Sequence, residues 1–215
     1  NRLIGIGETM ARKYDVVVTN PPYMGSSGMG ARLSNYVKKN YPDSKSDMST
    51  VSMECTMKMC TPHGYMAMIN IPVWMFLSSY EKLRYKLLKE STVVNMVHPG
   101  RGIFGSDFGT TTFVFSKRHL NGYKGHYRRL FEKQGEVESI EEREQAFLSG
   151  KGQFATVQDN FSKIPGAPIA YWVSRAIYDA FSMKTLADYC PPKAGLSTAD
   201  NERFLRVFWE VPHSK

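Results

Sequence analysis

The feature that most constrains the fold is a short β-branched run that ends in two prolines. Residues 15–19 read Asp-Val-Val-Val-Thr, and residues 20–23 read Asn-Pro-Pro-Tyr. Because neither a helix nor a central strand continues through two prolines, the run predicts a buried strand that ends at Thr19. Such strands are typical of parallel α/β sheets, in which functional side chains collect at the carboxyl ends of the strands.

Three further strand-like runs follow, and helical patterns precede two of them. The strands are expected at residues 65–71, 92–98 and 110–116, and the helices at 33–41, 49–60 and 79–89. The first three strands fit right-handed crossovers in a parallel sheet. The connection before the last strand has about ten residues, which is too short for a helical crossover, so this strand is predicted to run antiparallel to the third.

The remainder of the chain has a different character. It contains a strand-like run at 122–131, an acidic helical pattern at 136–148, an irregular segment at 150–168, a helical pattern at 168–182 and a short element at 198–209. We therefore predict two parts: residues 1–120 as part of a catalytic domain, and residues 121–215 as a linker and the start of a recognition region.

Composition narrows the class of protein. Apolar residues make up 42% of the 215 residues and charged residues 22%, as in an ordinary globular chain, and no apolar run approaches the length of a membrane span. Three cysteines without zinc-site spacing predict neither a disulfide framework nor a metal site, and free thiols favour the cytoplasm. The net charge is +8, and almost all of this surplus lies before residue 119. A basic first half is typical of a surface that binds a polyanion such as DNA. The alternative is a basic surface that only meets solvent.

The Asn-Pro-Pro-Tyr motif suits chemistry on an amino group. The side-chain oxygen of Asn20 and the carbonyl of Pro21 can accept the two N–H groups of an exocyclic amine, which draws its nitrogen toward a tetrahedral, nucleophilic state. Tyr23 offers a ring face on which a base can stack. The alternative reading is a turn that only ends the strand, since Asn-Pro and Pro-Pro are common in turns. The preceding β-branched run and the following Gly/Ser-rich stretch favour the catalytic interpretation.

The sequence resembles a known family over nearly its whole length. Residues 15–23 are similar to motif IV of the N6-adenine DNA methyltransferases, and residues 60–72, 93–104 and 110–115 resemble the later helix end and strands of that family in the same order. The stretches at 100–115 and 195–206 are most similar to the adenine methyltransferases of BREX phage-defence systems and of single-chain restriction–modification enzymes, although Ala199 stands where their pattern has glycine. The resemblance implies an α/β fold: the C-terminal half of a Rossmann-like methyltransferase sheet with an antiparallel last strand, followed by an α+β extension.

The resemblance also implies roles for individual residues. The catalytic residues would be Asn20, Pro21, Pro22 and Tyr23, and the cofactor would be S-adenosylmethionine, with Asp47 near it. Contacts to DNA would come from aromatic and polar side chains in the basic half and near the end of the chain: Phe104, Phe108, Arg101, Lys38, Lys39, Lys45, Asn201 and Arg203. The glycine-rich cofactor loop of the family is absent, so we expect these 215 residues alone to bind S-adenosylmethionine weakly or not at all.

The expected partners are double-stranded DNA, other proteins of a defence system, and a second copy bound through exposed sheet edges. Two other functions fit the same motif. One is methylation of a glutamine amide or an RNA base, because both present the same amino group. The other is a catalytically inactive fragment that binds DNA or a protein partner.

Overall fold

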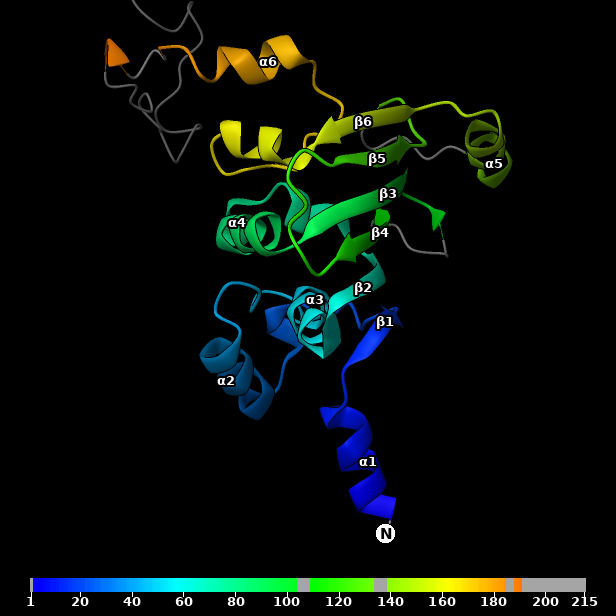
Figure 1. The fold of residues 1–215 in the computed structure, drawn as a ribbon, viewed down its shortest axis with the longest axis vertical. Coiled ribbons are helices and arrows are strands. Elements are labelled where there is room, and N and C mark those ends of the chain that lie inside the picture. Colours follow the sequence, from blue (N-terminus) through cyan, green and yellow to red (C-terminus); the bar gives the residue numbers. More distant parts are fainter. Residues whose placement is uncertain (1, 104–108, 134–138, 185–187, 191–215) are drawn as a thin grey trace, which may run out of the picture.

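The computed structural model describes residues 2–103, 109–133, 139–184 and 188–190. Within these residues it contains a six-stranded sheet in the order β1-β2-β4-β3-β5-β6 (Figure 1). The strands are β1 (Tyr14–Thr19), β2 (Cys60–Asn70), β3 (Thr92–Gly100), β4 (Thr110–Ser116), β5 (Lys124–Arg129) and β6 (Gln153–Val157).

The strand directions confirm the predicted topology. β1 pairs parallel with β2, and β3 pairs parallel with β5. β4 runs antiparallel to both β2 and β3, with Phe113 opposite Met68 on one side and Met96 on the other. The fourth strand therefore reverses direction as its short connection requires, and it inserts between two strands that precede it in the sequence.

Helices of the first half lie on one side of this sheet. They are α2 (Ala31–Asn40), α3 (Met48–Met59) and α4 (Glu81–Glu90), on the left in Figure 1. α3 packs against β1 and β2, and α4 packs against β3. α5 (Ile140–Leu148) and α6 (Arg175–Ala180) accompany the later strands. No helix among the described residues is long and apolar enough to cross a membrane.

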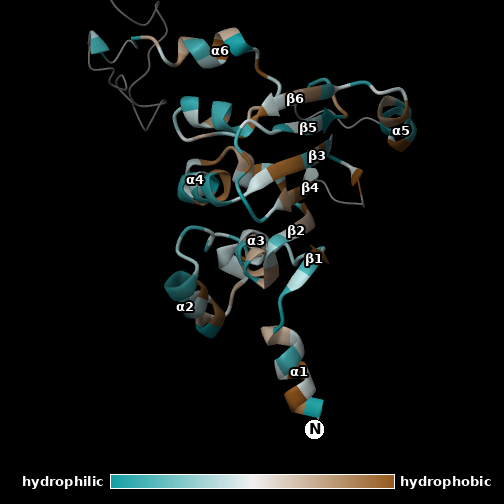
Figure 2. Ribbon diagram, viewed as in Figure 1, coloured by the Kyte–Doolittle hydropathy of each residue, from teal (hydrophilic) through white to brown (hydrophobic). Residues whose placement is uncertain are grey.

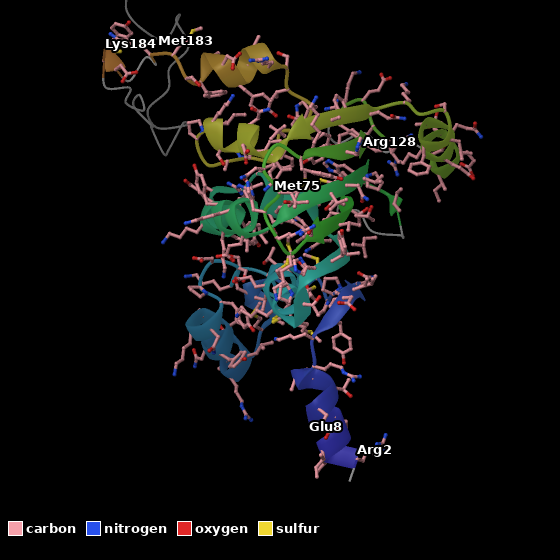
Figure 3. The ribbon with its side chains drawn as sticks, in the orientation of Figure 1. Arg2, Glu8, Met75, Arg128, Met183 and Lys184 are labelled. Atoms are coloured by element: carbon pink, nitrogen blue, oxygen red, sulfur yellow. The ribbon has the colours of Figure 1, made fainter. Side chains whose placement is uncertain are left out.

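The core lies around the middle strands. Trp74 is fully buried against Phe113 and Phe115, whose rings meet it at centroid distances of 5.4 and 6.2 Å. Figure 2 shows the hydrophobic colouring concentrated on β3 and β4, and Figure 3 shows Met75 within the body of the molecule. These contacts make the centre of the sheet its most firmly packed part.

The first strand differs from the prediction. It was expected to be buried, but it forms the edge of the sheet, and the side chains of Val16 and Val18 are 60% and 70% exposed. The helix α1 (Arg2–Ala11) precedes it, has no buried residue and projects away from the sheet (Figure 1). The apolar residues of β1 therefore meet solvent on one face, because within the described residues nothing covers them.

The second strand also differs, because it begins earlier than its predicted start at residue 65. The helix ends at Met59, and β2 starts at Cys60 and includes Pro62. Its pairing with β1 has a register shift between Tyr14 and Val16, which accommodates this irregular start. A proline near the first residues of a strand costs little, because the ladder is not yet regular there.

Residues after 120 extend the same sheet. β5 and α5 confirm the predicted strand and acidic helix, and α5 begins with a capping box between Ser139 and Glu142. The segment at 150–168 was expected to be irregular, and this was wrong: it contains β6. The helix expected at 168–182 is limited to α6, because the preceding residues run against the core, where the amide of Ile169 donates to the carbonyl of Met75. The element expected at 198–209 lies outside the described residues.

Candidate active site

The Asn-Pro-Pro-Tyr motif lies where two parallel strands end side by side. Asn20 directly follows β1, and Ile69 is the next-to-last residue of β2. The hydroxyl of Tyr23 lies 2.9 Å from the side-chain oxygen of Asn20 and 3.2 Å from the carbonyl of Ile69. Because the hydroxyl has one proton, the two oxygens share it, and Tyr23 connects the ends of both strands.

This geometry leaves acceptor capacity for an amine. The oxygen of Asn20 has two lone pairs, and Tyr23 engages one of them. Within the described residues no hydrogen bond reaches the carbonyl of Pro21. Burial raises the pKa of the Tyr23 hydroxyl, so it remains a neutral donor at pH 7. Tyr23 is still 40% exposed, so a planar group can lie against its ring.

The loop after Tyr23 is fixed to the beginning of α3. The amide of Ser26 donates to Ser46, and the amide of Met48 donates to Met24, both at 2.9 Å. These bonds form a short antiparallel bridge between Gly25 and Asp47. The exposed motif is thus held by a helix whose first turns are buried, at Ser49, Val51 and Met53.

Asp47 has a structural task in this arrangement. It is the N-cap of α3, and its carboxylate accepts the amide of Ser49 at 2.8 Å. The side chain is buried. A contact to a cofactor by Asp47 stays a prediction, and the structure by itself explains this aspartate as a helix cap.

Asn70 is a supporting residue that the sequence analysis missed. It is fully buried at the end of β2, where its amide nitrogen donates to the carbonyl of Ser49 and its oxygen accepts the amide of Ile71. Thr111 on β4 donates to the carbonyl of Asn70. Asn70 therefore fixes the end of β2 next to the carbonyl that holds Tyr23. In the sequence, the signal for this supporting role was a polar residue at the end of an apolar strand.

The predicted DNA contacts fall into three groups. Lys38 and Lys39 are exposed in the last turn of α2, and Lys45 is exposed in the turn before α3. Arg101 is exposed just beyond β3, on the far side of β4 from the motif. The remaining residues lie outside the described part of the chain: Phe104, Phe108, Asn201 and Arg203.

Among the described residues, those of the motif match the amine that accepts the methyl group. Four cavities of about 140 to 560 Å³ occur among them, and none of these four is lined by the motif. Asp47, the acidic side chain near the motif, is occupied by its helix. These residues present an acceptor pair and a stacking ring for an amine. Within the described residues no group of three metal-ligating side chains occurs.

Comparison with solved structures shows the class of fold. The methyltransferase subunit of a type I restriction–modification system from Streptococcus thermophilus aligns with a TM-score of 0.54 over 76% of this chain and 39% of its own, at 14% identity. The type ISP restriction–modification enzyme LlaGI aligns with a TM-score of 0.51 over 72% of this chain and 18% of its own, at 16% identity. These likenesses show the class of fold, a Rossmann-like α/β sheet.

Sequence comparison gives the family. The model of the Eco57I restriction-modification methylases matches residues 4–104. The adenine-specific methyltransferase PglX of Lacticaseibacillus casei is 37% identical over 99% of this chain, and BrxX of Escherichia coli is 40% identical over 94% of it. The chain belongs to this family of adenine-specific methyltransferases. It spans 18% and 17% of the length of these two curated relatives.

Proposed function

We propose that the chain is part of an S-adenosylmethionine-dependent DNA methyltransferase that modifies the N6 amine of adenine, in a phage-defence or restriction–modification system. The observation that carries the proposal is the pairing of Asn20 and Tyr23 at the joined ends of β1 and β2. The names of both curated relatives, adenine-specific methyltransferases, support adenine over a glutamine amide or an RNA base.

The residues of the motif would act on the amine alone. The free lone pair of the Asn20 oxygen and the carbonyl of Pro21 accept its two N–H groups, and this holds the nitrogen lone pair away from the ring system. Tyr23 supports the base with its ring and orients Asn20 with its hydroxyl. S-adenosylmethionine would supply the electrophilic methyl group and would leave as the thioether. The methylated nitrogen would then lose one N–H proton to solvent, so no strongly basic side chain is required.

DNA is the proposed substrate, and the exposed lysines of α2 suit its phosphates. The proposal places the protein in the compartment that holds the DNA, the cytoplasm. Other proteins of the defence system are proposed partners. The open edge of β1, with Val16 and Val18 exposed, favours pairing with a further strand, so we also propose self-association of the isolated chain.

The test is methylation of DNA by the intact protein that carries this chain. Digested DNA is analysed for N6-methyladenine by mass spectrometry. Asn20→Ala is expected to lower the rate at least about 100-fold, because it removes a hydrogen bond that strengthens as charge develops on the amine. Asn35→Ala, at an exposed asparagine of α2, is the matched control and should leave the rate unchanged. Full activity of Asn20→Ala would refute the site. Methylation of glutamine or RNA instead of DNA would refute the substrate.

A further inference from the structure

A small cavity lies at the same edge of the sheet as the motif, beyond the ends of β3 and β5. Its volume is about 140 Å³. Its walls come from the ends of β3 and β5, from the segments that follow β2 and β5, and from the chain before α6: Phe76, His98, Arg129, Phe131, Glu132 and Trp172. Three aromatic rings, a guanidinium, an imidazole and a carboxylate thus meet around one opening.

Arg129 is held by ring faces. Its guanidinium carbon lies 5.7 Å from the ring centroid of Phe131, 5.8 Å from that of Phe154 and 5.6 Å from that of Trp172. Within the described residues its side chain forms no hydrogen bond or ion pair. The carboxylate that lines the cavity, Glu132, is paired at 2.7 Å with Lys151. The guanidinium therefore keeps its positive charge and its N–H donors for a ligand.

His98 contributes a neutral polar edge. It is buried, and its Nδ1 lies 3.2 Å from the hydroxyl of Tyr171. Burial and the nearby charge of Arg129 lower the pKa of His98 to about 4, so the ring is uncharged at neutral pH. Among the described residues the other ring nitrogen has no hydrogen-bond partner, and it can meet the edge of a ligand.

The side chains of the walls pack against one another. Phe131 packs edge-on against His98 at a centroid distance of 4.8 Å. Gly100, with φ of +87°, makes this possible, because a Cβ there would lie 2.9 Å from the Phe131 ring. Trp172 lies against Phe76 and Tyr171 at centroid distances of 5.7 and 5.0 Å. A preformed site loses little conformational entropy when it binds.

This set of groups matches one nucleotide. Ring faces stack on a base, a guanidinium pairs with a phosphate, and a neutral imidazole hydrogen-bonds to a base edge. In the sheet order, β3 and β5 are three and four strands from β1, so the cavity lies roughly 14–19 Å from Asn20 at about 4.8 Å per strand. That span corresponds to about four to six base pairs at a rise of about 3.4 Å each.

We propose that this cavity binds a second, unstacked nucleotide of the DNA, with its base against Trp172 and Phe131 and its phosphate on Arg129. The inference rests on the proposed function for the identity of the polymer. It adds a binding site, lined by residues from both predicted parts of the chain, that is separate from the Asn-Pro-Pro-Tyr motif.

The first experiment uses the intact protein and duplex DNA, and it measures equilibrium binding by fluorescence anisotropy. Arg129→Gln is expected to weaken binding about tenfold and to lower the slope of log Kd against log salt by about one. Arg118→Gln is the matched control: it removes the same charge beyond the end of β4, at the opposite edge of the sheet, and should change Kd less than about twofold. Equal effects of the two variants would overturn the proposal.

A second experiment does not depend on how well a variant folds. Duplexes with 5-iodouracil at successive positions are crosslinked by light to the wild-type protein, and the crosslinked peptides are sequenced. Crosslinks to Trp172 or Phe131 from a narrow window of positions are expected, and crosslinks that never include either residue would overturn the proposal. DNA binding is measured without a methylation readout, so failure of the methyltransferase assignment would remain distinguishable from failure of this site.

Discussion

The first and the fourth strand, β1 and β4, differ in how they are stabilised. β1, which carries the motif, is an edge strand with exposed valines and follows a helix without a buried residue. β4, two places away in the sheet, is buried between β2 and β3, and its Phe113 and Phe115 pack on Trp74. Figure 3 shows Met75 inside the body of the molecule, whereas Arg2 and Glu8 lie on the projecting α1 that precedes β1.

The contrast shows that the motif is not positioned by burial of its own strand. It is positioned from the side, by the bond of Tyr23 to Ile69, by the bridge between Gly25 and Asp47, and by the buried amide of Asn70. Substitutions in the core should therefore act on stability, whereas substitutions at the motif should act on activity.

The largest expected effect is on stability, where Phe113→Ala should lower the free energy of unfolding far more than Val18→Ala. Removal of the fully buried Phe113 ring should lower the free energy of unfolding by about 4 kcal/mol, because it leaves a cavity against Trp74. Val18→Ala should change it by less than about 0.5 kcal/mol, because the side chain already meets water. Urea denaturation followed by circular dichroism measures both. An equal loss would mean that β1 is covered in solution.

The next effect concerns pH and the His98 cavity. The folded-state pKa of about 4 lies below the ordinary value of 6.5, so folding favours the neutral ring. Above pH 6.5 the ring is neutral in both the folded and the unfolded protein, and the free energy of unfolding has its full value. As the pH falls from 6.5 toward 4, the unfolded chain takes up a proton that the folded protein does not, so the free energy of unfolding falls by about 3 kcal/mol. The groups that face the ring are Arg129, Glu132 and Tyr171. The difference in unfolding free energy between wild type and His98→Gln should shrink over this range, and a constant difference would contradict the buried neutral state.

A smaller effect is expected when the motif loses one hydroxyl. Tyr23→Phe keeps the stacking ring but removes the bonds to Asn20 and Ile69, so the methylation rate should fall about tenfold. Thermal unfolding should hardly change. Tyr36→Phe, on the exposed face of α2, serves as the control and should leave both quantities unaltered. A rate unaffected in Tyr23→Phe would show that the ring alone matters.

The smallest effect belongs to the exposed lysines of α2. Lys38→Gln and Lys39→Gln should each weaken DNA binding two- to threefold at low salt, because each removes one phosphate contact. The effect should vanish at high salt. Lys82→Gln on α4 is the control. If all three variants bind alike, α2 lies away from the DNA.

Much of the strand order in the first half could be predicted from the sequence, since short apolar runs and the length of each connection determine strand direction. The exposure of β1 could not be predicted, because a run of valines predicts a buried strand whether or not another element covers it. β6 was missed because its five residues, Gln153–Val157, form a short run without a clear alternating pattern, and they follow two glycines. The Asn-Pro-Pro-Tyr motif could be singled out as a candidate site from four letters, whereas the bond from Asn70 to α3 depends on the packing of β2 beside that helix.

The insertion of β4 has a kinetic consequence. β3 and β4 are close in the sequence and can form a hairpin early, but β2 meets β3 only through β4, which is made about forty residues after β2 ends. During synthesis the pair of β1 and β2 therefore waits, with the second edge of β2 unpaired, until residue 116 has left the ribosome. We expect the hairpin to be the folding nucleus and the strand that bears the motif to dock late, so slow synthesis before β4 would prolong the period of greatest exposure to aggregation.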